Sequence, residues 1–115
     1  MFKIIMLIKK RPELSDAEFW EHWRAHSAKV LALREVLGIR HYSKTRPEPA
    51  ASQRPTQTFG YDAMGELWYA SREDFLRARQ TPAGRAALAE LRADERRFVD
   101  WENSVLWFGH EERLL

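Results

Sequence analysis

His26 is the residue best suited to chemistry, because it is a titratable side chain on an otherwise apolar helical stripe. The stripe consists of Phe19, Trp23, His26, Val30 and Leu33, whose spacings alternate between four and three residues, as on one face of a helix. An imidazole titrates near neutral pH and is therefore a common proton carrier in enzymes. At this position it is either a hydrogen-bonded core residue, the more common case for a buried polar group, or the reactive group of a pocket under the helix.

Tyr42 is the second candidate for chemistry. It lies in a predicted strand, Ile39–Arg46, where Arg40, Tyr42 and Lys44 share one face. A phenol donates a hydrogen bond to an oxyanion that develops during a reaction, so His26 and Tyr42 would form an acid–base pair if both faced one cavity. Simple packing of a half-buried tyrosine is the alternative.

A pocket under the helix is favoured by small residues in the predicted strand Tyr61–Ala70. Ala63 and Gly65 follow each other on one face of this strand and leave space there. A glycine within a strand often marks the close approach of a ligand or of another part of the chain. The alternative is that bulky side chains of the helix fill the space.

Metal and cofactor sites have little support in the sequence. His22 and His26 stand four residues apart, a spacing that allows two imidazoles to share a metal ion. No third ligand is evident, with His41 and His110 as the remaining candidates. The chain has no cysteine, no glycine-rich phosphate loop, no dinucleotide fingerprint and no serine nucleophile elbow. We therefore expect neither a metal nor an organic cofactor. Asp94–Arg97 is interpreted as a solvent-exposed helix end.

The elements that must position these residues follow the order βαββαβ, which is the ferredoxin-like plan of the α+β class. The predicted strands are Phe2–Lys9, Ile39–Arg46, Tyr61–Ala70 and Ser104–Gly109. Ser15 and Glu18 form a capping box that begins a helix running to about Glu35, and Ser71 and Thr81–Pro82 begin further helical segments. The proline-rich stretch Pro47–Pro55 is predicted to be a loop, and a loop of this length would be suited to gate the pocket.

This plan predicts a four-stranded antiparallel sheet with two helices on one face. The first strand is apolar on both faces, so something must cover the face that lacks helices. A second copy of the same sheet is the simplest cover, and we expect a homodimer.

Length and composition limit the remaining classes of function. The 115 residues suffice for one domain, 1–115, and its 19 basic and 17 acidic residues are well mixed, which gives no nucleic-acid footprint. The apolar start of the chain is too short to span a membrane and lacks the pattern of a signal peptide. With no cysteine, the composition fits a reducing compartment, and we expect a cytoplasmic protein with no membrane or nucleic-acid partner.

The order and spacing of several segments resemble the EthD family. The segments are the opening strand Phe2–Lys9, Phe19–His26, Gly38–Tyr42, and Asp94–Glu95 before Phe98–Asp100. The stretch Tyr61–Ser71 is also similar to part of the 4-methylmuconolactone methylisomerases, which are small relatives. The resemblance implies a dimeric α+β barrel, cofactor-free chemistry on small organic molecules, and an association with ethyl tert-butyl ether degradation. By matching position, His26 and Tyr42 correspond to a catalytic histidine and a strand tyrosine, whereas Leu67 stands where the methylisomerase has a cysteine.

The leading hypothesis is a cofactor-free enzyme that moves protons on a hydrophobic small molecule such as a lactone, phenol or quinone, in degradation or secondary metabolism. It would be an isomerase or dehydratase-like lyase, with His26 and Tyr42 as catalytic residues. The residues expected to contact the substrate are His22, Trp23, Gly65, Leu67 and Tyr69. The alternatives are a cofactor-independent oxidoreductase or monooxygenase, and a non-catalytic accessory protein of an ethyl tert-butyl ether degradation-type pathway.

Overall fold

The computed structural model describes residues 1–48 and 59–115. The strands within these residues are β1 (Phe2–Ile8), β2 (Ile39–Thr45), β3 (Ala63–Tyr69) and β4 (Val105–His110). The helices are α1 (Asp16–Ala32), α2 (Arg34–Leu37), α3 (Arg72–Ala78), α4 (Pro82–Glu95) and the short 3-10 helix η2 (Trp101–Asn103). The α+β class and the ferredoxin-like plan are confirmed.

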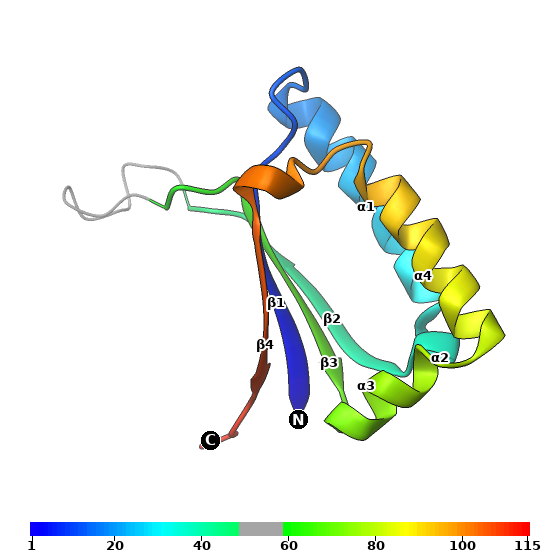
Figure 1. The fold of residues 1–115 in the computed structure, drawn as a ribbon. Coiled ribbons are helices and arrows are strands. Elements are labelled where there is room, and N and C mark those ends of the chain that lie inside the picture. Colours follow the sequence, from blue (N-terminus) through cyan, green and yellow to red (C-terminus); the bar gives the residue numbers. More distant parts are fainter. Residues whose placement is uncertain (49–58) are drawn as a thin grey trace.

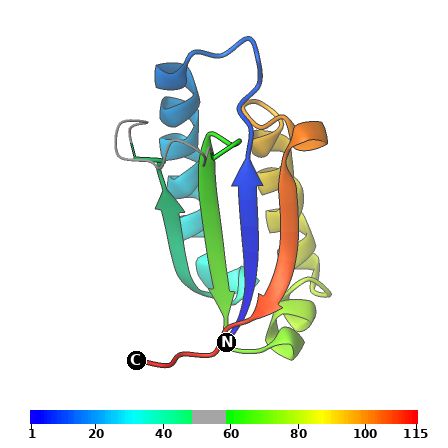
Figure 2. The same cartoon turned by 90° about the vertical axis from the view of Figure 1, so that its left-hand side faces the viewer.

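The sheet is antiparallel, has the order β2-β3-β1-β4, and is covered by helices on one face (Figures 1 and 2). The register decides which side chains lie under the helices. Ile4 of β1 pairs with Leu67 of β3 and with Phe108 of β4, and this set faces the helices. The next residue, Ile5, pairs with Glu66 and Trp107 and therefore belongs to the opposite face.

Helix α1 begins as the capping box predicts. The backbone N–H of Glu18 donates to the Ser15 hydroxyl at 3.1 Å, and the backbone N–H of Ser15 donates to the Glu18 carboxylate at 2.9 Å. The predicted end at about Glu35 is wrong, because α1 ends at Ala32 and the short α2 follows after one turn residue. Gly38 then reverses the chain with a φ of 70°, which a residue without a Cβ adopts readily.

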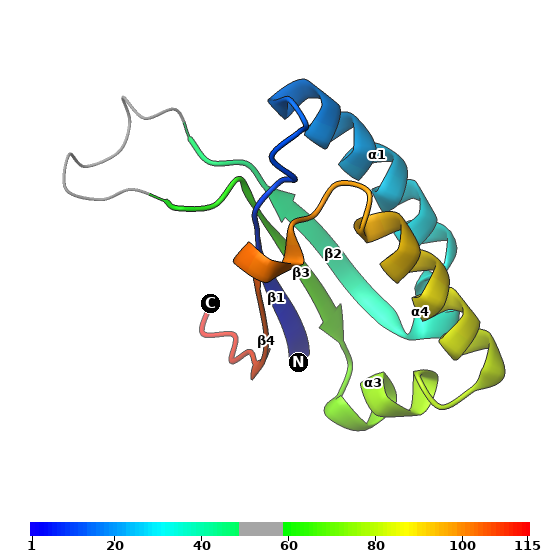
Figure 3. The same cartoon turned by 45° about the horizontal axis from the view of Figure 1, so that its top comes forward.

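The second helical region is divided into two helices. The Ser71 hydroxyl accepts from the backbone N–H of Asp74 and begins α3, and Thr81 accepts from the N–H of Gly84 and begins α4. Pro82 stands at the first helical position, where its missing N–H costs no hydrogen bond. Helices α1 and α4 then lie side by side across the sheet (Figures 1 and 3).

The core between sheet and helices consists of two clusters. The first lies toward the α2 and α3 end and contains Phe2, Ile4, Val30, Leu37, Ile39, Tyr69, Phe75, Ala87 and Leu91. The second lies toward the start of α1 and contains Ile8, Phe19, Trp23, Ala63, Phe98 and Val99.

The other face of the sheet carries no helix of the described residues (Figure 2). Trp107 and Val105 of β4 keep 48% and 38% of their surface exposed on this face.

Most of the predicted Pro47–Pro55 loop lies outside the described residues, and so does the suggested gate. Among the helices of the described residues, none is long and apolar enough to cross a membrane.

Candidate active site

A narrow cavity lies between the sheet and helices α1 and α4, where the two core clusters meet. Its volume is about 40 Å³. The lining residues are Met6, Ile8, Trp23, His26, Val30, Tyr42, Leu67, Leu91, Glu95, Phe98, Val99 and Trp101. Nine of these side chains are apolar or are indole rings, and the remaining three, His26, Tyr42 and Glu95, can exchange protons.

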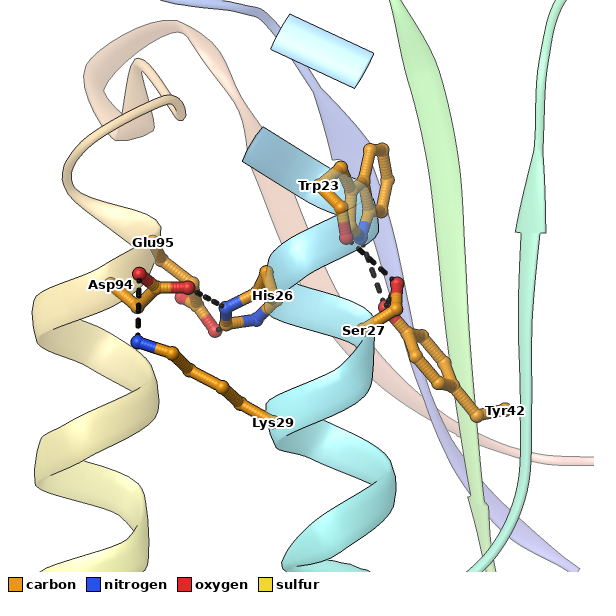
Figure 4. Close-up of polar contacts among 7 residues, drawn as sticks. All are labelled: Trp23, His26, Ser27, Lys29, Tyr42, Asp94 and Glu95. Carbon is orange, nitrogen blue, oxygen red and sulfur yellow. Dashed lines mark hydrogen bonds and ion pairs between the residues drawn. The ribbon is translucent and has the colours of Figure 1, made fainter. Parts of the chain in front are cut away.

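His26 is held in this cavity by an acidic partner from α4. Only 5% of the residue is exposed, and its Nδ1 lies 2.8 Å from the Asp94 carboxylate (Figure 4). The Lys29 ammonium lies 3.3 Å from the other oxygen of Asp94. Burial raises the pKa of the Asp94 carboxyl, but the hydrogen bonds from His26 and Lys29 outweigh it and the net pKa is lowered. Asp94 is therefore a carboxylate that accepts the Nδ1–H of His26, and Nε2 carries the lone pair.

The charge state of His26 follows from the same surroundings. Burial lowers the pKa of the imidazole more than the hydrogen bond to Asp94 raises it, and the cations Lys29 and Lys44 lower it further. The neutral ring is thus the resting form at neutral pH, and its Nε2 can act as a base.

Glu95 brings a second carboxyl group to the ring. Its Oε1 lies 3.6 Å from Nε2 of His26, and its side chain is 23% exposed. Burial raises the pKa of this carboxyl to about 7, and the neighbouring Asp94 raises it also. The opposing influences are Arg92, Arg96 and a hydrogen bond with Trp101.

The prediction that Asp94–Arg97 is a solvent-exposed helix end is therefore wrong for its first two residues. Asp94 is 11% exposed in its side chain and Glu95 lines the cavity, whereas Arg96 and Arg97 are exposed. The sequence held one signal of this. Glu95 follows Ala87 and Leu91 at intervals of four on the inner stripe of its helix, so a carboxyl group stands where an apolar side chain is expected.

Tyr42 reaches the same cavity from β2, but its hydroxyl has its own partners. The Trp23 indole N–H donates to the phenol oxygen at 2.9 Å, and Ser27 Oγ lies 3.1 Å away (Figure 4). Ser27 donates its proton to the carbonyl of Trp23, so the phenol O–H donates to Ser27. Burial raises the pKa of Tyr42 despite both hydrogen bonds, and the phenol stays protonated.

The other predicted site residues are distributed over several places. Trp23 and Leu67 line the cavity. The His22 ring stacks on Phe98 with its centroid 6.0 Å away, and Tyr69 packs in the first core cluster. Gly65 lies beneath the ring of Trp23, because a Cβ there would be 3.1 Å from Trp23 Cζ2 and from Met6 Cε. The space left by Gly65 is thus occupied by these side chains.

The structure supplies no further support for a shared metal between His22 and His26. Across residues 1–48 and 59–115, no group of three or more His, Asp or Glu side chains is placed to hold a metal ion. In addition, Nδ1 of His26 is occupied by Asp94.

Solved structures with this fold include proteins of different descriptions. An EthD family protein from Bacillus halodurans is 24% identical, with a TM-score of 0.66, and the match covers 97% of this chain and 99% of that one. A dimeric protein of unknown function with a ferredoxin-like fold from Bacteroides fragilis is 14% identical over 96% and 95% of the two chains, with a TM-score of 0.60. SnoaB, a cofactor-independent oxygenase from Streptomyces nogalater, is 13% identical over 99% and 95%, with a TM-score of 0.58.

A search of curated proteins found no match. The model of the EthD domain, in contrast, matches residues 11–102, which span α1, α4 and the whole acid–base group of the cavity. The protein therefore belongs to the EthD family.

Proposed function

We propose that the protein is a cofactor-free enzyme that transfers protons on a small hydrophobic organic molecule, with isomerase or dehydratase-like chemistry on a lactone, phenol or quinone. The observation that carries this proposal is the state of His26. Asp94 fixes its Nδ1 proton, and the basic Nε2 lines an apolar cavity. An imidazole with this tautomer and this lowered pKa is suited to remove a proton from a bound molecule at neutral pH.

The size of the cavity restricts the substrate. A buried water needs roughly 10–15 Å³ on the same measure, and pockets for drug-sized ligands have roughly 300–1,000 Å³. A cavity of about 40 Å³ must widen even for a small lactone, and the flexible Met6 side chain in its wall is suited to move. We propose that Tyr42 exchanges its Ser27 partner for a substrate oxygen, with Trp23 and Leu67 as apolar contacts.

A homodimer belongs to the same proposal. The exposed apolar face of the sheet supports it, as does the fold shared with a protein described as dimeric. The similarity to the methylisomerases, a place in degradation or secondary metabolism and a cytoplasmic location remain predictions from the sequence.

The probe for this proposal is α-angelica lactone, a small lactone that isomerises to β-angelica lactone when one carbon loses a proton and another gains one. Wild-type protein should accelerate the isomerisation over buffer, and His26→Gln should reduce the rate by at least about 100-fold. Glutamine can still donate to Asp94, so the variant should fold, which urea unfolding verifies. His41→Gln, on the opposite face of the sheet, should keep the wild-type rate.

Isomerisation that persists unchanged in His26→Gln would refute the assignment. The accessory or carrier alternative predicts a different result for wild type. The lactone would bind and quench the fluorescence of the cavity tryptophans, but no product would form. The oxygenase alternative is suggested by the fold shared with SnoaB. It predicts instead that the protein consumes dissolved oxygen when given a phenolic probe such as 1-naphthol, which an oxygen electrode records.

A further inference from the structure

Glu95 is a partly buried acidic group with no role in the removal of a proton by His26. It lies on the inner stripe of α4, one residue after Asp94, and it lines the cavity beside His26 (Figure 4). The two carboxyl groups approach different atoms of the ring. Asp94 is bonded to Nδ1, whereas the Glu95 Oε1 lies 3.6 Å from Nε2, the nitrogen with the lone pair.

The distance between Glu95 Oε1 and His26 Nε2 determines whether the two groups bond to each other or to a ligand. At 3.6 Å, Oε1 and Nε2 are too far apart for a good hydrogen bond, yet both residues line the same cavity. A ligand in the cavity can therefore contact both atoms. Once the ligand has left, a small movement of the Glu95 side chain brings the two atoms within range of direct proton transfer.

The charge states of the two groups are compatible with opposite roles. The raised pKa of Glu95, about 7, leaves much of this carboxyl protonated at neutral pH, and the lowered pKa of His26 leaves the ring neutral. The charged groups around the pair are Asp94, Lys29 and Lys44 near the ring and Arg92 and Arg96 near the carboxyl. An acid and a base thus coexist in one cavity without neutralising each other.

We propose that Glu95 is a further catalytic residue, which donates a proton to one atom of the substrate after His26 has removed a proton from another. This inference rests on the proposed function and names the group for its second step. Its substrate class is a molecule that isomerises through an enolate, such as an unsaturated lactone.

The step is balanced for α-angelica lactone. The C–H bond at ring carbon 3 breaks, its proton binds to Nε2 of His26, and its electron pair forms a dienolate. The O–H bond of Glu95 then breaks, and the dienolate electrons form a new C–H bond at ring carbon 5. The site is left with an imidazolium and a carboxylate, and transfer of the proton from Nε2 to Glu95 restores both.

The test uses the lactone in D₂O, where NMR separates the two steps. Deuterium at carbon 3 of the recovered substrate reports proton removal, and β-angelica lactone reports proton donation at carbon 5. Wild type should show both. Glu95→Gln should keep exchange at carbon 3 close to the wild-type rate and lose isomerisation by at least about 100-fold. Glu90→Gln, an exposed position of the same helix, is the matched control and should behave as wild type.

Each other outcome contradicts the proposal in a distinguishable way. Wild-type isomerisation by Glu95→Gln overturns the role of Glu95 and leaves that of His26 intact. Loss of exchange as well as isomerisation in Glu95→Gln places Glu95 in the first step and overturns its assignment as the donor. Exchange and isomerisation that survive in His26→Gln, or that wild type lacks, overturn the proposed function and this inference together.

Discussion

At the residue scale, two consecutive carboxyl groups act on one imidazole in different ways. Successive residues of an α-helix point about 100° apart, so Asp94 and Glu95 cannot occupy the same place beside the ring. Asp94 pairs with Lys29 and His26 and is kept charged. Glu95 faces the apolar cavity and is held partly neutral. The difference in pKa between neighbours with the same chemistry comes from burial and from partners, and it separates a positioning group from an acid–base group.

Replacing Glu95 by glutamine should make the folded protein more stable at alkaline pH. The pKa of Glu95 is about 7 in the folded protein and 4.5 in its ordinary state. A raised carboxyl pKa stabilises the fold at low pH, and this contribution is lost as the pH rises from 4.5 through 7. Glutamine has no such loss. Urea unfolding should therefore show Glu95→Gln more stable than wild type by up to about 3 kcal/mol at pH 8, with the difference shrinking toward pH 4.5.

The exposed Glu90→Gln variant is the control for this comparison, and its stability should follow the wild-type dependence on pH. Parallel curves for Glu95→Gln and wild type between pH 5 and pH 8 would show that the folded protein does not resist ionisation of Glu95.

At the element scale, local signals predicted the strands and the helix starts, whereas the site required contacts between distant elements. Ser15, Ser71 and Thr81 act within three residues of themselves, so their caps were readable in the sequence. The pairing of His26 with Asp94 joins positions 68 residues apart and depends on how α1 crosses α4. The apolar stripe of each helix can be read from the sequence, but the angle at which the helices cross cannot. The contact of His26 with Asp94 could therefore not be predicted.

Gly65 shows how closely α1 packs on the sheet. In Gly65→Ala, the new Cβ would be 3.1 Å from Trp23 Cζ2, and the Trp23 ring is held by its hydrogen bond to Tyr42. The flexible end of Met6 can move, but the indole cannot without losing its partner. Overpacking costs about 1–3 kcal/mol, and the loss of glycine freedom in the unfolded chain offsets about 0.5–1 kcal/mol, so we expect a net destabilisation of roughly 1 kcal/mol in urea unfolding.

Gly60→Ala is the matched control, because no described atom lies within 4 Å of a Cβ at that position. It should leave stability unchanged or raise it slightly. The indole N–H signal of Trp23 should shift in NMR spectra of Gly65→Ala and stay in place in Gly60→Ala. Equal stability of the two variants would mean that the α1 layer is looser than the 3.1 Å contacts indicate.

At the scale of the whole molecule, the open face of the sheet remains to be explained. It carries apolar side chains from three strands, namely Ile5 and Leu7 of β1, Met64 and Trp68 of β3, and Val105 and Trp107 of β4. Lys3 and Glu66 form an ion pair of 2.8 Å on the same face, and the Lys3 ammonium lies 4.9 Å from the centre of the Trp68 ring. A contiguous apolar surface with a few paired charges is typical of a face that is buried against a partner.

A single charge on this face should therefore dissociate the proposed homodimer. Trp107 pairs with Ile5 of the central strand and is 48% exposed in the single chain. In Trp107→Glu, an unpaired carboxylate would lose its water on association, which costs about 3 kcal/mol or more and weakens dimerisation by at least about 100-fold.

Leu31→Glu places the same charge on a 49% exposed leucine of α1, in the helix layer, and should not affect dimerisation. Sedimentation at micromolar concentration should find dimers for wild type and Leu31→Glu and monomers for Trp107→Glu. A monomeric wild type would refute the dimer, and an equally dimeric Trp107→Glu would move the interface to another surface.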